Sequence, residues 1–560
     1  MKEKENNKKG LKMFSKIVTV AIFIILISVV INIAPNYVRD ELKGKVNLII
    51  NNSNVTKSLK NDVYIDENDT VYISTKDIAN FFDGSIFYDN KYDQIITTSK
   101  TKIATLGINK NEIEINGSKQ TIYSSAIKKQ ENFYLPFSEI QSVYNVEVNY
   151  IKDTNIVTID SLDKEQKKAN CSNDVNVKYL PTMFSKTVDN VKKGESVIVI
   201  NENVDGYYKI RTKNGIIGYV KDVANIRNVR EDMENEKQIN GAISLVWDYF
   251  SEYAKAPNRN GTSIKGVNVV SPTFVTLISG ENGNINVNIG AQGKNYITWA
   301  HENGYKVWPS ISNNSYKQTT SAVLNDYKLR QKLINNIVKV ALENNFDGIN
   351  LDFENIYMAD KDMFTQFVIE LAPRLREYGM VLSIDVTAPD GSEDWSMCYD
   401  RNKLAKKADY LVFMAYDQYN GDSEKAGTTA GTDWIEVALK KFVGTQEEVP
   451  AEKIILGMPF YTRLWKEQNG KVTSTVVFMK SINSTIPQDV ERVWDKDLKQ
   501  YYVEYTKNGA TYKMWIEDEK SIKEKFDLLN NYKLAGAAYW AKDREKETIW
   551  DIVSEKLNIK

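Results

Sequence analysis

Three polar side chains alternate with apolar ones in residues 347–354: Asn350, Asp352 and Glu354. Residues two apart in a β-strand point to the same face, so these three share a face and the apolar residues take the other one. Neighbouring carboxyl groups at a strand end can perform general acid–base chemistry, because each shifts the pKa of the other. The segment predicts a strand buried on both faces, as in parallel α/β sheets. The same alternation is also typical of an edge strand with one solvated face.

The segments that follow indicate which fold positions these residues. Further apolar runs that predict strands are 381–388, 410–417, 454–461 and 535–540. Residues 326–344 and 361–378, which lie between strands, have apolar residues at three- and four-residue spacing, as in helices. Strands that alternate with helices over about 300 residues predict a (β/α)8 TIM barrel for 238–560, with its chemistry at the carboxyl ends of the strands.

Three motifs in order resemble glycoside hydrolase family 18. Residues 347–354 are similar to its fourth-strand motif Asp-Gly-x-Asp-x-Asp-x-Glu, 414–417 to its sixth-strand Met-x-Tyr-Asp, and Trp540 to its eighth-strand tryptophan. The chain most resembles the bacterial branch that trims peptidoglycan, including spore-cortex-lytic N-acetylglucosaminidases. The resemblance implies retaining hydrolysis of β-1,4-linked N-acetylglucosaminyl bonds of peptidoglycan, with the 2-acetamido group of the substrate as nucleophile.

Other functions are compatible with the same motifs. A chitinase or an endo-β-N-acetylglucosaminidase would act on other glycans, and a pseudoenzyme would bind glycans without cleaving them. The presence of Glu354, the expected general acid, favours an enzyme.

The resemblance implies a role for each site residue. Glu354 is expected to be the general acid and then the base, with a pKa above its ordinary value. Asp352 would accept a hydrogen bond from the acetamido N–H, and Tyr416 would bind the acetamido oxygen. The residues expected to contact the sugar are Asp417, Trp540, Met414 and Tyr461. The alternatives are core packing for Tyr416, Trp540 and Met414, and a turn cap for Asp417.

The chain departs from the family at Asn350, where the family usually has Asp. An Asp there would share a proton with Asp352 as an interacting carboxyl pair. Asn cannot ionise, so we expect this coupling to be absent and Asn350 to orient Asp352 by a hydrogen bond. Asp347, the first residue of the motif, is expected to support the site.

Composition excludes several other classes of function. The single His excludes His-based triads and multi-histidine metal sites. Cys171 and Cys398 fall in different predicted domains and make no disulfide or zinc framework. A net charge of −1 and a pI of about 6.2 argue against nucleic acid as a partner. We expect no cofactor, no metal and a monomer.

The amino terminus predicts a membrane anchor. Several lysines in the basic tail 1–16 precede an apolar run over 17–34, and none lies within that run. The run is near the lower length limit for a transmembrane helix, about 17 residues. The lysines place the tail in the cytoplasm and the remainder outside the cell membrane, facing the cell wall. The alternative is a cleaved signal peptide.

Two small domains are expected between the anchor and the barrel. A pattern that starts at Val71 recurs from Phe133, an offset of 62 residues, which makes 45–162 a duplicated α+β domain. It resembles the copper amine oxidase N-terminal domain, which binds no copper, and a spacer role is expected. Residues 175–228 resemble a bacterial SH3-like barrel that either binds cell-wall peptide or is a spacer. The linkers would be 164–173 and 230–237.

Overall fold

The computed structural model describes residues 16–25, 44–230, 239–250 and 255–559. Residues 16–25, the first part of the predicted anchor, are helical. Among the described residues, none of the helices is both long and apolar enough to cross a membrane. Residues 26–34 of the predicted span and most of the basic tail lie outside the described residues, so the anchor stays a prediction.

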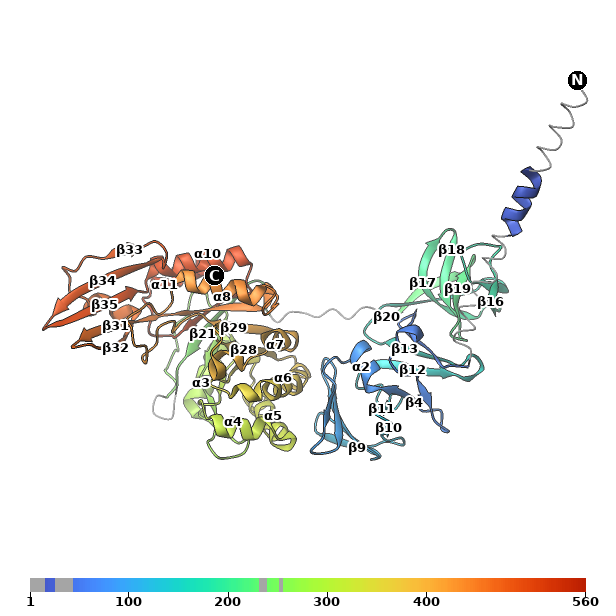
Figure 1. The fold of residues 1–560 in the computed structure, drawn as a ribbon, viewed down its shortest axis with the longest axis horizontal. Helices are drawn as coiled ribbons and strands as arrows, with labels where there is room; N and C mark the ends of the chain where they lie inside the picture. Colours follow the sequence, from blue (N-terminus) through green and yellow to red (C-terminus); the bar gives the residue numbers. More distant parts are fainter. Residues whose placement is uncertain (1–15, 26–43, 231–238, 251–254, 560) are drawn as a thin grey trace, which may run out of the picture. The chain divides into compact units, whose positions relative to one another are not determined.

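The chain divides into two compact units, Met1–Glu236 and Lys237–Lys560. Residues 44–161 of the N-terminal unit consist almost entirely of strands and turns (Figure 1). Its elements are β1 (Asn47–Ile50), β2 (Ser53–Asn54), β3 (Tyr64–Ile65), β4 (Val71–Ser74), α2 (Thr75–Phe81), β5 (Phe87–Asp89), β6 (Gln94–Thr98), β7 (Ile103–Gly107), β8 (Glu112–Ile115), β9 (Ser118–Thr121), β10 (Ile127–Lys129), β11 (Asn132–Pro136), β12 (Val146–Ile151) and β13 (Ile156–Ser161). They form three sheets, ordered β12-β13-β1-β2, β10-β11-β4-β3 and β5-β6-β7-β8-β9.

The predicted duplication is visible in part of this region. Ile78 and Ile140, which correspond at the offset of 62, are both fully buried in one core. Helix α2 follows β4, whereas turns follow β11 at the corresponding place. Residues 138–142 thus form turns where the first copy has a helix.

The second part of this unit is a seven-stranded antiparallel sheet, ordered β16-β15-β19-β18-β17-β14-β20. The strands are β14 (Gln166–Asn170), β15 (Val175–Lys178), β16 (Thr187–Val191), β17 (Ser196–Val204), β18 (Tyr207–Arg211), β19 (Ile217–Val220) and β20 (Ala224–Arg230). The predicted linker 164–173 was wrong in one respect, because β14 lies within it and pairs with β17 and β20. The strand was not predicted because its sequence is mostly polar and only Gln166 and Ala169 are buried.

The C-terminal unit contains a closed ring of parallel strands, as predicted. Its members are β21 (Ile243–Asp248), β22 (Val269–Pro272), β25 (Lys306–Val307) with β26 (Ser310–Ser312), β27 (Gly348–Asp352), β28 (Val381–Val386), β29 (Tyr410–Met414), β30 (Ile454–Pro459) and β36 (Gly536–Trp540). Parallel pairing runs around this order, and β36 pairs back with β21. Two short strands, β23 (Val275–Leu277) and β24 (Ile285–Val287), extend the sheet beside β26.

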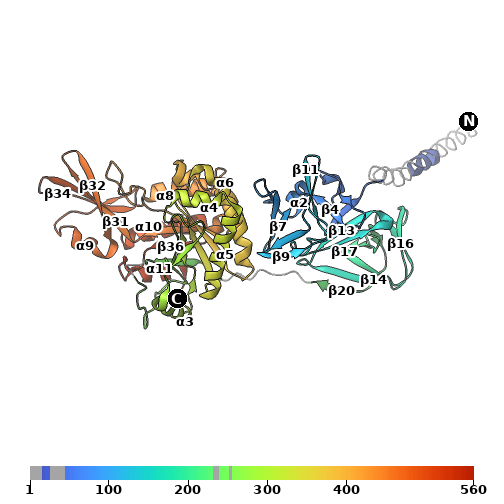
Figure 2. The same ribbon diagram turned by 90° about the horizontal axis from the view of Figure 1, so that it is seen from below.

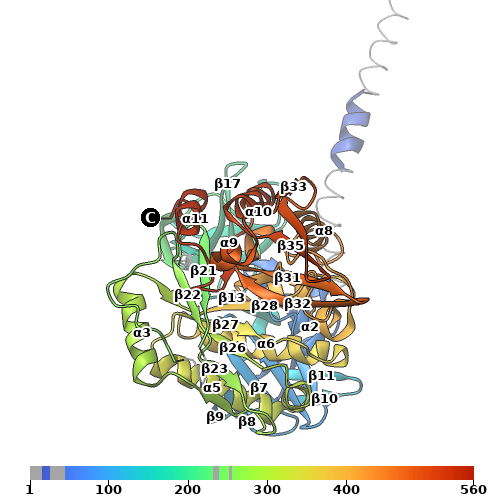
Figure 3. The same ribbon diagram turned by 90° about the vertical axis from the view of Figure 1, so that its left-hand side faces the viewer.

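Helices surround the ring (Figure 3). They are α3 (Gly290–Glu302), α4 (Lys317–Leu324), α5 (Tyr327–Glu343), α6 (Lys361–Arg376), α7 (Arg401–Lys407), α8 (Thr432–Val443), α10 (Glu519–Tyr532) and α11 (Ile549–Leu557). In α5 the buried residues Leu333, Ile334 and Ile337 recur at helical spacing and pack on the strands. A second, smaller cluster fills the inside of the ring, with Leu245, Trp247 and Val412 among its members.

An antiparallel sheet, which the sequence analysis did not predict, is inserted between β30 and α10. It comprises β31 (Tyr461–Gln468), β32 (Lys471–Phe478), β33 (Val493–Asp495), β34 (Gln500–Lys507) and β35 (Ala510–Ile516), with α9 (Ile482–Thr485) after β32. The sheet projects from the barrel at one side (Figure 2). Tyr461 and Arg463 on its first strand lie next to the end of β29, as described below.

Candidate active site

Strand β27 carries the predicted motif and points it as expected. Ile349 and Leu351 are fully buried against the surrounding helices, and Asn350 is fully buried on the inner side of the ring. The chain beyond the strand is fixed through its backbone. Asn313 accepts a hydrogen bond from the Glu354 N–H at 3.0 Å and donates one to the Glu354 carbonyl at 2.9 Å. These two hydrogen bonds fix the position of the Glu354 backbone, from which the side chain projects.

Asp352 and Glu354 form a coupled pair of carboxyl groups. Burial raises the pKa of Asp352 to about 6, and the nearby polar groups of Glu354 and Ser310 oppose this increase. Burial also raises the pKa of Glu354 well above its ordinary value, and the negative charges of Asp352, Asp385 and Asp417 add to it. This raised pKa agrees with the direction predicted for Glu354. A protonated Glu354 beside an ionised Asp352 is the arrangement expected of a proton donor.

The predicted hydrogen bond from Asn350 to Asp352 was wrong. The amide nitrogen of Asn350 instead donates to Asp385 Oδ1 at 2.7 Å and to Ser383 Oγ at 3.2 Å, both on β28. Its oxygen accepts from Trp247 Nε1 at 2.7 Å. Residues two apart on a strand are separated by about 6.6 Å, whereas adjacent strands are about 4.8 Å apart. The short amide side chain of Asn350 therefore reaches residues on the adjacent strand more readily than Asp352 on the same strand.

Asp385 is the site residue that the sequence analysis missed. It is 1% exposed, and burial followed by the charge of Asp352 raises its pKa well above the ordinary value. Leu351 pairs with Ile384, so Asp352 and Asp385 are neighbours on adjacent strands. Asn350 itself carries no charge to couple with Asp352, as expected, but a second carboxyl group that was not foreseen enters from β28. An isolated acidic residue in a fully buried strand, otherwise apolar except for Ser383, was the available signal.

The strand next to β28 contributes a tyrosine and a carboxylate. Tyr416 and Asp417 directly follow β29, and burial raises the pKa of both. Tyr461 donates a hydrogen bond to Asp417 Oδ1 at 2.7 Å, and an Arg463 guanidinium nitrogen lies 4.0 Å from the same oxygen. The Tyr416 and Tyr461 rings meet edge to face, 6.3 Å apart. The inserted sheet thus fixes Asp417 beside Tyr416.

Trp540 ends β36 and is partly exposed, and its ring meets that of Trp247 edge to face, with 5.8 Å between the two ring centres. The Arg544 guanidinium lies over the Trp540 ring at 5.4 Å. Met414 is 8% exposed, near the end of β29. These residues, with Asp352, Asp385 and Tyr416, all lie at or just beyond the carboxyl ends of ring strands, where barrel enzymes have their active sites.

Asp347 does not support this site. It precedes β27, at the opposite end of the strand from Glu354. Its carboxylate accepts hydrogen bonds from His301, Lys306 and the Val307 N–H, each at 2.9 Å. These contacts tie α3 and β25 to the amino-terminal end of the barrel, so the predicted role was wrong. A strand of five residues is simply too long for both of its ends to reach one site.

The described residues contain no group of three or more His, Cys, Asp or Glu side chains that could hold a metal ion. Cys171 and Cys398 are both buried free thiols. The chemical groups described at the carboxyl ends of the strands are carboxyls, two phenols, indoles and two guanidinium groups. This set can donate a proton, accept hydrogen bonds and contact a ring.

Two family models match the chain. The one described as glycosyl hydrolases family 18 matches residues 246–545, and the copper amine oxidase N-terminal domain matches residues 49–159. The second match confirms the predicted similarity for the N-terminal unit.

Curated relatives match part of the chain. An uncharacterized glycosylase of Bacillus subtilis, YvbX, is 28% identical over 284 residues, which are 49% of this chain and 80% of that protein. The cortical fragment-lytic enzyme of Bacillus subtilis is 26% identical over 247 residues, 42% of this chain. The chain spans only 56% of the length of that relative.

Solved structures have the same fold. A chitinase from Chromobacterium violaceum is 26% identical and superposes with a TM-score of 0.50. The superposition covers 57% of this chain and 100% of that one. The spore cortex-lytic enzyme SleL of Bacillus megaterium is 21% identical, with a TM-score of 0.50, and covers 65% of this chain and 89% of that one. At this identity the second likeness indicates the fold alone.

Proposed function

Because this chain belongs to family 18 of the glycosyl hydrolases, we propose that it cleaves β-1,4-linked N-acetylglucosaminyl bonds of peptidoglycan with retention of configuration. The observation that carries the proposal is the cluster of Asp352, Glu354 and Asp385 with Tyr416 at the carboxyl ends of three adjacent strands. The raised pKa of Glu354 keeps a proton available for the leaving glycosidic oxygen.

In the first step, Glu354 gives its proton to the glycosidic oxygen as the bond from C1 to that oxygen breaks. The acetamido oxygen of the same sugar bonds to C1 and forms an oxazolinium ion. In the second step, water loses a proton to the Glu354 carboxylate and attacks C1, which reopens the ring. Two inversions at C1 return the β configuration.

Asp352 has a free acceptor for the acetamido group. Its Oδ1 is buried and has no hydrogen-bond partner in the described residues. A buried acceptor without a donor is unfavourable, and the acetamido N–H would supply the donor. This contact would hold the nucleophilic oxygen toward C1, a positioning effect. Tyr416 would donate to that oxygen, and Asp417 and Trp540 would contact the sugar ring.

Asp385 would replace the carboxyl group that the family usually carries at the position of Asn350. It enters from β28 and shares electrostatic coupling with Asp352, while Asn350 holds it by the 2.7 Å hydrogen bond. In this chain the two carboxyl groups thus come from two strands. Asp385 would be a positioning residue that adjusts the charge of Asp352 and the pKa of Glu354.

Peptidoglycan is the proposed substrate because of both the relatives and the N-terminal sequence. Among the relatives are enzymes named as lytic toward cortical fragments. The lysine-rich tail and apolar run support an anchor in the cell membrane, with the barrel outside it. Chitin is the second candidate, since the structure from Chromobacterium violaceum is that of a chitinase.

Mass spectrometry of purified peptidoglycan after digestion tests the proposal. We expect new fragments that end in reducing N-acetylglucosamine, and none with a Glu354→Gln variant. New ends at N-acetylmuramic acid would contradict the bond assignment. Cleavage of chitin oligomers with no cleavage of peptidoglycan would instead favour the second candidate.

A further inference from the structure

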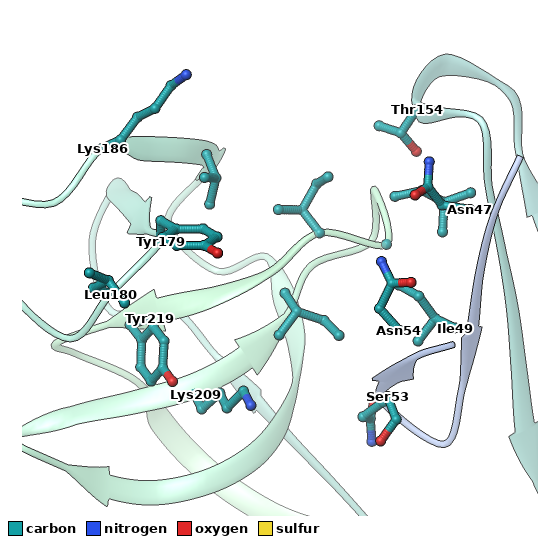
Figure 4. A pocket seen from close by; sticks show the side chains of 16 residues that line it. Asn47, Ile49, Ser53, Asn54, Thr154, Tyr179, Leu180, Lys186, Lys209 and Tyr219 are labelled. Atoms are coloured by element: carbon teal, nitrogen blue, oxygen red, sulfur yellow. The ribbon is translucent and has the colours of Figure 1, made fainter. Parts of the chain in front are cut away.

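Two surfaces of the described residues take no part in the function proposed above. The cavity of ≈ 660 Å³ in the N-terminal unit, beside β1, has a mixed lining that identifies no single class of ligand (Figure 4). The other surface lies on the barrel, where Met358, Trp395 and Met397 are 38%, 42% and 44% exposed. These residues belong to the loops that follow β27 and β28, two neighbouring strands. A group of large apolar side chains on adjacent exposed loops is typical of an interaction site.

The loop that carries Trp395 is held against the end of β27. Asp394 accepts a hydrogen bond from the Met358 N–H at 2.9 Å, and Tyr399 donates one to the Phe353 carbonyl at 2.8 Å. Trp395 lies between these two anchors in the sequence. The backbone that the anchors hold also carries the proposed proton donor. Trp395 therefore flanks the segment from which the proton donor projects.

The backbone of Trp395 is fixed while its ring is exposed. Thr387 Oγ1 donates to the Trp395 carbonyl at 2.5 Å, and Thr387 lies two residues beyond Asp385 of the carboxyl cluster. The neighbouring Asp394 also pairs with Lys317 of α4, at 2.7 Å. These contacts hold the loop without using the indole. A ring that is already held in place loses little conformational entropy when a ligand binds to it.

The order of the strands indicates which part of a glycan would reach this ring. Trp540 ends β36, and β29 with β30 separates β36 from β28 in the ring of strands. Trp395 and Trp540 therefore lie on opposite sides of the mouth of the barrel, with Glu354 on the side of Trp395. A sugar held by Trp540 and Asp352 would have its leaving oxygen at Glu354. The sugar beyond that oxygen would then extend toward Trp395.

The chemistry of the surface suits a sugar ring. One face of a pyranose presents C–H groups and its hydroxyls project at the rim, and an indole offers a flat apolar surface with a polar N–H at its edge. Asp394 and Lys317 pair with each other, so they give no preference for a charged ligand. Met358 and Met397 have flexible apolar side chains that can follow the margin of a ring.

We propose that Trp395 forms a subsite for the sugar on the leaving side of the cleaved bond. This inference rests on the proposed function, because it assigns the leaving side from the role of Glu354. The pyranose ring would lie on the indole, with the two methionines at its margin. Hydrolysis would then depend on Trp395 only for substrates that have a sugar on the leaving side.

Two substrates separate this role from the chemical step. The N-acetylglucosamine tetramer has sugars on the leaving side, whereas the β-fluoride of N-acetylglucosamine loses only fluoride. Trp395→Ala should lower kcat/KM for the tetramer by at least about tenfold, because the stacking and burial of the ring are lost, and should keep that for the fluoride within about twofold. Trp395→Phe should recover part of the loss.

Tyr378→Ala is the matched control. Tyr378 is 48% exposed and lies in the turn between α6 and β28, at the amino-terminal end of the ring of strands. This variant should change neither rate. Equal losses on the two substrates in Trp395→Ala, or no loss on the tetramer, would overturn the subsite.

Calorimetry in the Glu354→Gln background keeps the test independent of catalysis. There, Trp395→Ala should weaken binding of the tetramer by at least about fivefold, and equal binding would overturn the subsite. If the wild-type chain cleaves neither substrate, the proposed function fails, while weaker binding in Trp395→Ala would still support a sugar subsite at this ring. The two failures are therefore distinguishable.

Discussion

Replacement of Asp385 by Asn tests the idea that a second carboxyl group on β28 tunes the proton donor. The amide oxygen introduced by Asp385→Asn could still accept the hydrogen bond from Asn350, so the change removes a charge and keeps the shape. The charge of Asp385 raises the pKa of Glu354. Its removal should therefore lower that pKa, and activity should be lost at a lower pH on the alkaline side.

The size of the change follows from the strand register. Leu351 pairs with Ile384, so Asp385 lies beside Asp352 and Glu354 lies two residues farther along. Strand spacing of about 4.8 Å and a two-residue advance of about 6.6 Å put the charges roughly 8 Å apart. Two charges at that distance interact by ~2 kcal/mol at an effective dielectric constant of about 20, which corresponds to roughly 1.5 pKa units. Water at the mouth of the site weakens the interaction between the two charges. We therefore expect the alkaline limb to move down by about 1 pH unit.

The assay is the pH dependence of kcat/KM on soluble N-acetylglucosamine oligomers with a fluorogenic leaving group, because kcat/KM reports the free enzyme. Ser383→Ala is the matched control, since Ser383 also contacts Asn350, at 3.2 Å, but carries no charge. It should lower activity without moving either limb. An alkaline limb that stays in place in Asp385→Asn, or that moves equally in Ser383→Ala, would refute the electrostatic role.

Other predictions concern the acid, the nucleophile and the N-terminal unit. Glu354→Gln should reduce turnover by at least about 10²–10⁴-fold while glycan binding persists, and more than a tenth of wild-type activity would remove Glu354 from the acid role. Early-time NMR should detect the β anomer as first product, and substrates without the acetyl group should not be cleaved; an α product would defeat the mechanism. Arg211→Ala leaves Asp160 buried without its partner and should destabilise the N-terminal unit by about 3–5 kcal/mol, measured by urea unfolding, with the barrel transition unchanged.

The barrel was predictable because its strands and helices have clear periodicities. Alternation in 347–354 placed Asn350 and Asp352 inside the ring, and helical spacing located α5 and α6 to within two residues. These signals are local, since each depends on residues a few positions apart.

The interactions between strands were not predictable in the same way. Asn350 contacts Asp385, 35 positions away, and that contact depends on the register of two strands. Asp347 appears in the same motif as Glu354 but lies at the other end of the strand. The inserted sheet was missed because its strands lie between two segments that both fit the barrel pattern. A linear pattern thus indicates which face a residue is on, but not which neighbour it meets.

The carboxyl cluster has a consequence for the stability of the fold. A carboxyl group whose pKa is raised by folding binds its proton more tightly in the native state than in the unfolded chain. At acid pH these carboxyl groups are protonated in both the native and the unfolded state, so they cost the fold no stability. As the pH rises above about 4 the unfolded chain gains from ionisation, while in the native state Asp352 keeps its proton until about pH 6 and the pKa values of Glu354 and Asp385 are also raised. The native barrel therefore loses stability across the pH range in which its acid must stay protonated to work, and the loss is complete only once the acid ionises. Heat resistance would then be gained most readily by the substitutions that abolish catalysis, which ties the thermal limit of this protein to its chemistry.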